Sequence, residues 1–427
     1  MNNYNLKSKL KSNLIFLYIL QFFMQIFPVL LMPYLSRNLG MNNYGIFQFS
    51  YLLAGYICII SDYGYSLSAP KKIVKIRKDI KELNLYYTSV QIGRLILLLG
   101  ICILISIFFS FSDIYGIYEK GCILFMIYSL GNTIYPIWMF QGLEDMKASS
   151  TITMCSKISQ LFLVFTFVYN DTDLYKCIII YSIISVVQSC LGMYYLYHKY
   201  RIHFVKFKFN DVLLTFKEGW TLFVSQISTT LFSNINVFIL GAFATSEIVA
   251  SYSIGEKIVR TAVGLISPLN KAIYPISSEK FSKSLVEGMN FIRRIMKKGT
   301  LLFISISISL FVFSDLIAKI FVNSYVSYTS LVIKILSIIP TTIFLNNLFG
   351  TQIMINIGME KKFRNIIIST GVICISLSFI LVPNFSGIGM AIASLMSELY
   401  IVLMMFYILR KNLGGDFIEN ISSDMYI

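Results

Sequence analysis

Long apolar segments separated by short polar breaks recur along the chain from residue 14 to residue 409. A bilayer core about 30 Å thick is crossed by about 20 apolar residues in a helix, and the segments reach that length. Because lipid offers no hydrogen-bond partners, each segment must pair its own backbone groups, which predicts helices. The pattern predicts twelve membrane-spanning helices, at residues 14–36, 46–68, 85–110, 121–140, 149–169, 175–197, 219–243, 248–275, 299–321, 329–356, 365–383 and 387–409.

The composition agrees with this arrangement. Hydrophobic residues make up 56% of the 427 residues and charged residues only 13%, against about 25% charged in soluble domains. The fold class is therefore predicted as an all-α polytopic membrane protein. The seven cysteines have no CxxC spacing, and His198 and His203 lack acidic or thiol partners at ligand spacing. We therefore expect no metal site and no cofactor.

The distribution of basic residues predicts the orientation. Lysine and arginine are concentrated near both termini and in the breaks after even-numbered spans, whereas the other breaks contain only Arg37, Lys120 and Lys176. The positive-inside rule then places both termini in the cytoplasm. The net charge of +15 is explained by this topology and by attraction to anionic lipids, so it gives no evidence for nucleic-acid binding.

The loops leave little room for chemistry. The longest breaks, near residues 198–218 and 276–298, lie on the predicted cytoplasmic side, and no GxxxxGK[ST] motif is present. We therefore expect no enzyme activity. The two sets of six spans share a similar layout, which predicts an N-terminal lobe at 1–205 and a C-terminal lobe at 206–427. Such repeats are typical of transporters, which hold the substrate between the halves.

Charged residues within spans are costly and mark candidate functional sites. In span 248–275, polar side chains recur every three or four residues and would form one face of a continuous helix. They are Ser253, Glu256, Arg260, Gly264, Ser267 and Lys271. Glu256 and Arg260 have the spacing of a helical ion pair. The stripe is predicted to line a cavity, or else to be a simple ion pair with Lys271 reaching the membrane surface.

Other spans carry further candidates. Arg94 and Lys157 add cations in the cytoplasmic half, Gln21, Gln25 and Asn236 add amides, and Asp62 and Glu398 add acids. The acids either pair with the cations or take part in ion coupling, and the polar face around Asn236 either lines a cavity or packs against a helix. Fixed cations together with amides and hydroxyls suit an anionic, sugar-bearing substrate.

The segment "PIWMFQGLEDMK" closes the fourth span. Glu144 and Asp145 could be taken for an acid/base couple, but adjacent helical residues point about 100° apart, which is unsuitable for a two-carboxylate reaction. We predict instead that Trp138 is an interfacial anchor and that this segment is a moving boundary. Four residues are assigned to a gate or hinge: Arg37, Gln141, Gly142 and Glu144. Glu144 is expected to pair with a basic cytoplasmic loop across the lobe when the inward side closes.

Four motifs resemble those of Wzx-type O-antigen and polysaccharide flippases. "PYLSRNLGMNNYG" is similar to their P-x-L-x-R-x-L-G-x-x-x-Y-G, "SDYGYSLSAPKKI" to D-x-G followed by a basic segment, and "PIWMFQGLEDMK" to W-x-F-Q-G-x-E-x-M. In the second half, "YSIGEKI" and "SPLNKAIYP" resemble the eighth-span pattern of the family. The resemblance covers the first 150 residues and about 220–275, and the remainder matches by layout alone.

The resemblance implies two six-helix lobes around a cationic central cavity, as in the multidrug/oligosaccharidyl-lipid/polysaccharide exporter superfamily. It implies translocation of an undecaprenyl-diphosphate-linked oligosaccharide from the cytoplasmic to the periplasmic leaflet of the bacterial inner membrane. Alternating access coupled to H⁺ or Na⁺ would drive the movement, with polymerase and other polysaccharide-assembly proteins as partners. We assign Arg94, Lys157, Arg260 and Lys271 to the diphosphate path, with Glu256 holding Arg260.

Two alternatives remain open. An O-antigen polymerase or ligase is also polytopic, but such enzymes have a large periplasmic loop that the predicted topology lacks. A small-molecule exporter of the same superfamily would share the fold and differ in its substrate.

Overall fold

The computed structural model describes residues 27–111 and 113–413, apart from the side chains of residues 113–115, 221, 222, 224–235, 268, 271 and 272. The predicted site residues Gln21 and Gln25 lie outside this range, as does the side chain of Lys271. Within the described range every regular element is a helix, which confirms the all-α prediction.

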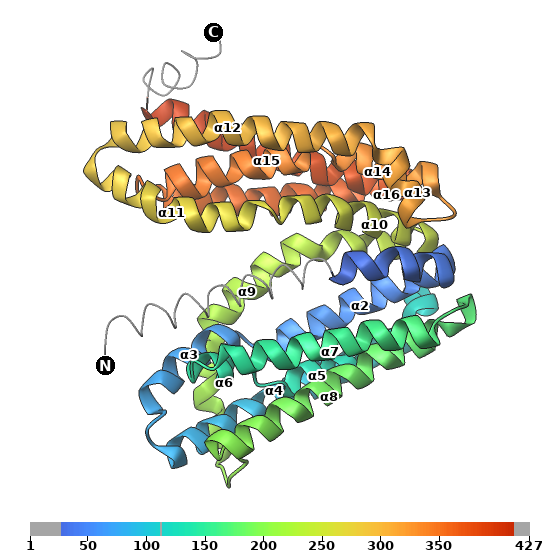
Figure 1. Cartoon of the computed structure of the whole chain (residues 1–427), viewed down its shortest axis with the longest axis vertical. Coiled ribbons are helices and arrows are strands. Elements are labelled where there is room, and N and C mark those ends of the chain that lie inside the picture. Colours follow the sequence, from blue (N-terminus) through green and yellow to red (C-terminus); the bar gives the residue numbers. More distant parts are fainter. Residues whose placement is uncertain (1–26, 112, 414–427) are drawn as a thin grey trace. The chain divides into compact units, whose positions relative to one another are not determined.

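The helices follow one another through short connections (Figure 1). In chain order they are α2 (Gly40–Asp62), α3 (Tyr65–Ile76), α4 (Ile80–Phe111), η1 (Asp113–Tyr118), α5 (Glu119–Ile134), α6 (Ile137–Gly142), α7 (Met146–Phe167), η2 (Asp171–Asp173), α8 (Leu174–Tyr200), α9 (Phe209–Phe243), α10 (Ser246–Val263), α11 (Ile266–Lys283), α12 (Leu285–Val312), α13 (Ser314–Phe321), α14 (Val326–Leu336), α15 (Ile339–Asn346), η3 (Asn347–Met354) and α16 (Glu360–Leu413).

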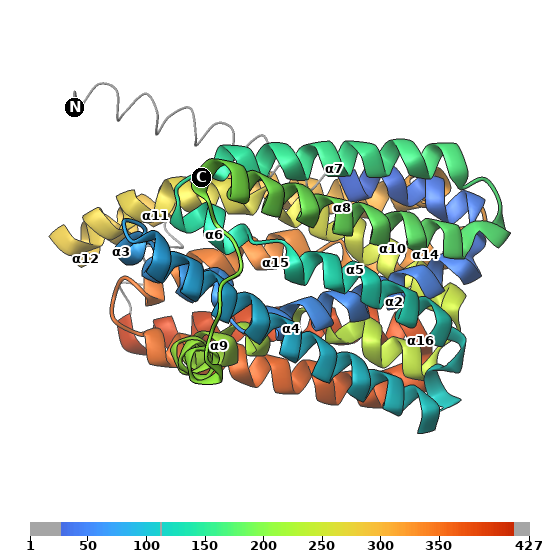
Figure 2. The same ribbon diagram turned by 90° about the horizontal axis from the view of Figure 1, so that it is seen from below.

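The chain folds as two compact units, unit 1 ending at Ala242 and unit 2 beginning at Phe243. In unit 1, α5 packs against α8, α2 and α4, and α7 packs against α8. In unit 2, α12 packs against α11 and α15, and α10 and α16 both pack against α14. The helices α5, α7 and α8 lie side by side in both views (Figures 1 and 2). The predicted boundary at 205/206 separates two transport lobes and is a different division from these compact units. It stays a prediction.

Eight segments of the described chain are long and apolar enough to cross a membrane. They are Gly40–Ile76, Ile80–Phe111, Gly116–Gly142, Met146–Phe167, Asp171–Tyr200, Leu285–Val312, Val326–Met354 and Glu360–Leu413. The first seven each overlap one predicted span, and the eighth contains two. The chain is therefore a multi-pass membrane protein, while the full count of twelve spans stays a prediction.

Prolines break two of the predicted spans. Tyr135, which precedes Pro136, has an extended backbone (ψ 116°) and separates α5 from α6, because a residue before proline is disfavoured in the helical region. The predicted continuous helix over 248–275 is wrong, since α10 ends at Val263 and α11 begins at Ile266. Pro268, four residues after Gly264, explains that break, because proline has no N–H to donate to the Gly264 carbonyl.

Helix α16 is a hairpin of two antiparallel halves. Ser386 has φ 50° and ψ −130° and interrupts the helical backbone. Two hydrogen bonds join the half before Ser386 to the half after it. Lys362 Nζ donates to Asn412 Oδ1 (2.7 Å), and the hydroxyls of Ser369 and Tyr400 lie 3.1 Å apart. The two last predicted spans are therefore separate helices joined by a sharp turn.

The contact between α5 and α8 depends on small residues. Three serines of α8, at spacings of three and four residues, donate to backbone carbonyls of α5: Ser182 to Leu124 (3.2 Å), Ser185 to Tyr128 (3.1 Å) and Ser189 to Gly131. Small residues allow close approach of helices in membranes, and serine hydroxyls add hydrogen bonds between them. Together they hold α5 and α8 in a fixed register.

Candidate functional site

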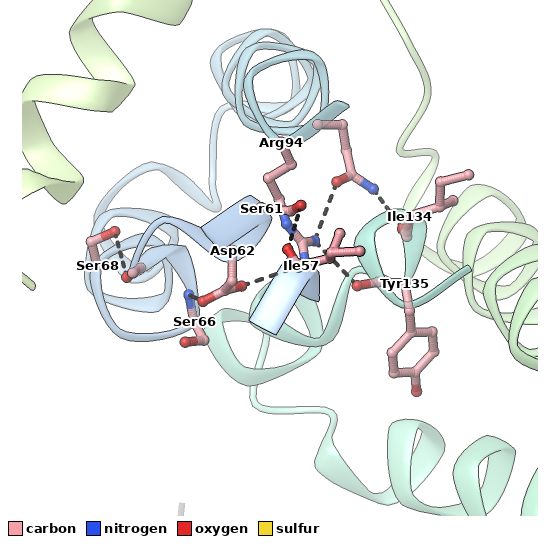
Figure 3. A network of polar contacts seen from close by, with 10 residues as sticks. Ile57, Ser61, Asp62, Ser66, Ser68, Arg94, Ile134 and Tyr135 are labelled. Atoms are coloured by element: carbon pink, nitrogen blue, oxygen red, sulfur yellow. Dashed lines mark hydrogen bonds and ion pairs between the residues drawn. The ribbon is translucent and has the colours of Figure 1, made fainter. Parts of the chain in front are cut away.

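The first cluster of site residues surrounds Arg94 in unit 1 (Figure 3). The Arg94 side chain comes from α4, and its Nη2 lies 3.4 Å from Asp62 Oδ1 at the end of α2. Its Nη1 donates to Gln91 Oε1 (3.4 Å) and to the backbone oxygen of Tyr135 (3.3 Å). Arg94 is 3% exposed and Asp62 is 9% exposed. The acid therefore pairs with the cation, which is one of the two roles predicted for it.

The interruption of the helix between α5 and α6 provides a hydrogen-bond partner for Arg94. The Tyr135 carbonyl is available because the helix stops before Pro136, and Gln91 Nε2 donates to the neighbouring Ile134 oxygen at 2.6 Å. Arg94 Nε is buried and has no hydrogen-bond partner in the described chain. A buried guanidinium with an unused N–H can donate to one more oxygen, so an oxygen of an anionic group would complete its hydrogen bonds.

The D-x-G motif has a structural role in the same cluster. Gly64 has φ 76° and lies between α2 and α3, a conformation that glycine adopts at little cost. Asp62 Oδ2 accepts a hydrogen bond from the Ser66 backbone N–H (3.2 Å), in the first turn of α3 (Figure 3). The carboxylate of Asp62 therefore joins the start of α3 to the guanidinium of α4.

Three other predicted residues of unit 1 are Lys157, Asn236 and Arg37. Lys157 of α7 is half-buried, donates to Gln160 Oε1 (3.0 Å) and lies 5.8 Å from the centre of the Phe27 ring. Asn236 of α9 is buried, at 4% exposure. Arg37 is exposed at the end of the helical segment before α2. A common path that joins them to Arg94 stays a prediction.

Unit 2 contains a second polar cluster. Arg260 Nε donates to Glu256 Oε1 at 2.9 Å within α10, as the four-residue spacing predicts. On α16, Glu398 Oε2 accepts from Asn346 Nδ2 of α15 at 2.8 Å, and Glu398 also interacts electrostatically with Arg260. The site in this unit therefore combines an intrahelical ion pair with a second, half-buried carboxylate.

Sequence reasoning did not identify several polar contacts of unit 2. The hydroxyls of Tyr252 and Ser394 lie 3.3 Å apart, joining α10 to α16. Asn270 Nδ2 of α11 donates to Asn347 Oδ1 (2.6 Å), at the start of the π-helix η3. π-Helical turns are rare and frequently occur at functional sites. No sequence pattern signals such a turn, although Asn347 lies in a polar stretch of an apolar span.

The boundary segment after α6 contacts both neighbouring basic regions. Glu144 has φ 60°, in the left-handed region, and its Oε1 lies 3.0 Å from Arg77 Nη1. Asp145 Oδ2 accepts from Lys199 Nζ (2.7 Å), Tyr200 Oη (2.8 Å) and Tyr195 Oη (3.0 Å). The two acids thus have different cationic partners, which agrees with the argument against an acid/base couple.

One glycine and one tryptophan of this segment, Gly142 and Trp138, are closely packed in unit 1. Gly142 packs directly on α3, because a Cβ there would lie 2.5 Å from Ile73 Cβ. Trp138 is 0% exposed and packs with Tyr86 and Tyr87 in the unit 1 core. The prediction that Trp138 is an interfacial anchor is therefore wrong: its ring contacts protein on all sides. Gln141 is half-buried, and its gate role stays a prediction.

Asp145 is expected to make unfolding depend on acidity. Burial raises its pKa, but donation from Lys199, Tyr200 and Tyr195 outweighs burial and holds the pKa below the usual value. A lowered pKa stabilises the fold fully above the unfolded value, about 3.9, and this contribution is lost as the pH falls below that value. Asp145→Asn should reduce the fall in melting temperature between about pH 5 and about pH 3, roughly one unit on either side of that pKa. Glu82→Gln, an exposed acid without an ion pair in the described chain, is the control, and equal slopes for both variants would contradict this role.

Glu144→Gln is expected to slow the translocation that the resemblance implies, with little effect on folding. The ion pair with Arg77 is exposed, with 69% of the Glu144 side chain accessible, and such pairs contribute about 1 kcal/mol or less to stability. Initial rates of transport and the amount of protein in the membrane should be measured together. Glu279→Gln removes a similarly exposed pair with Lys283 and should leave the rate unchanged. Equal rates for Glu144→Gln and the unaltered chain would make Glu144 an ordinary surface acid.

Comparison with known proteins supports one family. The sequence matches the family described as "Polysaccharide biosynthesis protein" over residues 10–281. A protein named "Putative O-antigen transporter" from Escherichia coli (strain K12) is 28% identical over 409 residues, covering 95% of this chain and 98% of the relative. A protein of the same name from Shigella dysenteriae is 24% identical over 404 residues, covering 93% and 99%.

The fold is similar to that of solved transporters. The structure titled "Lipid II flippase MurJ, inward closed conformation" matches with a TM-score of 0.72 at 13% identity, over 96% of this chain and 90% of that chain. An inward-facing multidrug resistance MATE family transporter of the MOP superfamily matches with a TM-score of 0.59 at 15% identity, over 91% and 100%. At these identities the likeness concerns the fold. The family match covers more than half of the 427 residues, and the chain belongs to the polysaccharide biosynthesis protein family, as its motifs predict.

Proposed function

We propose that this chain moves a lipid-linked oligosaccharide across the bacterial inner membrane, from the cytoplasmic to the periplasmic leaflet. The observation that supports it most is the match to two proteins named "Putative O-antigen transporter" along nearly their whole length. The family match and the MurJ-like fold agree with it. The substrate proposed is an undecaprenyl-diphosphate-linked O-antigen or capsule repeat unit.

The internal cations support an anionic substrate. Arg94 and Arg260 already bind carboxylates, Asp62 and Glu256. A diphosphate offers the same kind of oxygen acceptor and forms charge-assisted bonds with guanidinium groups. We therefore assign Arg94, Lys157, Arg260 and Lys271 to the diphosphate path, with Asp62 and Glu256 as the partners of the arginines in the absence of substrate.

The transport cycle proposed is alternating access between two six-helix lobes, residues 1–205 and 206–427, with twelve spans and both termini cytoplasmic. Asp62 and Glu398 are the candidate carboxylates for H⁺ or Na⁺ coupling. The residues proposed to act at the gate or hinge are Arg37, Gln141, Gly142 and Glu144. We propose polysaccharide-assembly proteins as partners of the chain.

The proposal is tested by complementation of a deletion strain. Without the gene, lipid-linked repeat units should accumulate on the cytoplasmic face and surface polysaccharide should be lost. Arg260→Ala and Lys271→Ala should each restore at most about a tenth of the surface polysaccharide, since loss of one charge-assisted bond of about 1.5–3 kcal/mol lowers transport by a factor of ten or more. Lys283→Ala, on the same helix as Lys271 and exposed, should restore it fully.

Two outcomes would contradict these assignments. Full surface polysaccharide with both Arg260→Ala and Lys271→Ala would remove these residues from the substrate path. Normal polysaccharide in the deletion strain, together with increased drug susceptibility, would instead favour the exporter of small molecules.

A further inference from the structure

Helix α12 carries a basic pocket that the transport path does not use. The pocket has a volume of about 740 Å³, within the range of about 300–1,000 Å³ that suits a small-molecule ligand. Its lining comes from α12 and from one residue of α15, Leu345. The lining residues are Asn290, Arg293, Arg294, Met296, Lys297, Lys298, Thr300, Leu301, Ile304 and Leu345.

The pocket changes character along its length. Arg293, Arg294, Lys297 and Lys298 lie at its N-terminal end, and the next two turns contribute Leu301 and Ile304. From residue 293 to residue 304 the helix rises by about 16 Å, roughly half of the hydrocarbon thickness of a bilayer. A cationic end followed by an apolar wall one leaflet deep matches a molecule that has an anionic head and a hydrocarbon chain.

Three cations of the pocket, Arg294, Lys297 and Lys298, are available to a ligand. No acid is among the described residues that line it. Arg294, Lys297 and Lys298 form no ion pair with any described side chain. Thr300 Oγ1 is buried and has no hydrogen-bond partner in the described chain. Because a buried hydroxyl without a partner is unfavourable, an oxygen-rich group here would improve the local energy as well as neutralise charge.

We propose that this pocket binds the headgroup of an anionic phospholipid, with an acyl chain lying along Leu301, Ile304 and Leu345. Basic pockets between membrane helices on the cytoplasmic side bind lipid headgroups, and the cytoplasmic leaflet is rich in anionic lipid. The positive-inside rule places the N-terminal end of α12 at that leaflet. A free phosphate would leave the apolar wall unused, and the pocket has few amides or hydroxyls for an oligosaccharide.

The ligand is tested with the full chain, purified in an uncharged detergent and titrated with phosphatidylglycerol, with native mass spectrometry counting the bound lipids. Neutralising three cations in Arg294→Gln/Lys297→Gln/Lys298→Gln should weaken binding roughly 100-fold, since each basic residue near a membrane surface contributes about five-fold. Phosphatidylcholine, which carries no net charge, should not bind at this site. If the triple variant and the unaltered chain bound phosphatidylglycerol equally well, the proposal would be overturned.

A matched variant distinguishes lipid binding at this pocket from a general attraction between lipid and any cationic surface of the chain. Lys71→Gln/Lys75→Gln/Lys78→Gln removes the same number of exposed cations from the basic segment of α3 and its C-terminal turn and should retain the lipid. An equal loss in both triple variants would overturn the proposal. If the α12 triple variant fails to fold, Leu301→Gln provides a second test, because Leu301 is 68% exposed. It should weaken phosphatidylglycerol several-fold while leaving glycerol phosphate binding unchanged, and equal lipid binding would overturn the proposal.

Two competitors identify the source of the phosphate. Inorganic diphosphate should displace phosphatidylglycerol only at concentrations at least 100-fold above that of the lipid, since it cannot use the apolar wall; equal competition would reduce the pocket to a simple anion site. Undecaprenyl phosphate should bind no better than phosphatidylglycerol. Stronger binding of undecaprenyl phosphate would assign the pocket to the transported substrate and overturn the proposal.

Discussion

Arg94→Leu is expected to lower the free energy of unfolding by about 3–5 kcal/mol, because the change leaves the buried carboxylate of Asp62 without its cation. It also removes the donors to Gln91 and to the Tyr135 carbonyl. Denaturant titration of the purified chain in detergent measures the loss. Surface polysaccharide in the complemented deletion strain should fall in parallel, beyond what the amount of folded protein explains.

A double variant separates the two effects. Asp62→Asn/Arg94→Gln replaces the ion pair by neutral groups that can still hydrogen bond, so it should recover most of the unfolding free energy, since an unpaired buried charge is what makes the single variant unstable. Transport should not recover, because the guanidinium is absent. Recovery of transport in the double variant would show that Arg94 only stabilises unit 1. An unchanged unfolding free energy for Arg94→Leu would contradict the buried pair itself.

Gly131→Ala is expected to destabilise the chain by about 1–3 kcal/mol or more, because the added Cβ would lie 2.5 Å from the carbonyl carbon of Ser185 and 2.7 Å from the Val186 nitrogen. Both atoms belong to the backbone of α8, so no rotamer change relieves the contact. The helices would have to separate, which would weaken the three serine hydrogen bonds of the α5–α8 contact. Thermal unfolding and the yield of monodisperse protein measure the effect.

Two other glycines provide matched controls with the opposite sign. Gly55 in α2 and Gly100 in α4 have open space around the position of a Cβ. Alanine at either position should stabilise the helix by about 0.5–1 kcal/mol, because glycine loses more backbone freedom on folding. A similar loss of stability at all three positions would mean that the close approach of α5 and α8 is not what makes Gly131 sensitive.

The spans are predictable from the sequence because their physical requirement is local. About 20 apolar residues in one run are needed wherever a helix crosses lipid, and seven of the eight apolar segments of the structure overlap one predicted span each. The breaks within spans were visible as Pro136 and Pro268. Their effect on the backbone was missed, since an apolar run continues through a proline even where the hydrogen-bond ladder does not.

The partners of the site residues are less predictable. Glu256 and Arg260 are four residues apart on one helix, so their pairing follows from helical geometry alone. Asp62 and Arg94 belong to different helices, and their contact depends on how α2 and α4 pack. Trp138 shows the same limit: an aromatic residue near a span end suits both a membrane interface and a protein core, and only its neighbours distinguish them.

The turn at Ser386 has a consequence for the synthesis of the chain. Gly389 packs so closely on the preceding half of α16 that a Cβ would lie 2.7 Å from the Leu381 carbonyl carbon, and Ser378 Oγ lies 3.4 Å from Met390 Sδ across the hairpin. The first half can make these contacts only after the second half has left the ribosome. The packing of the first half is therefore complete only when both halves have been synthesised, and a ribosome that stalls soon after Ser386 leaves the first half without the helix that it packs against.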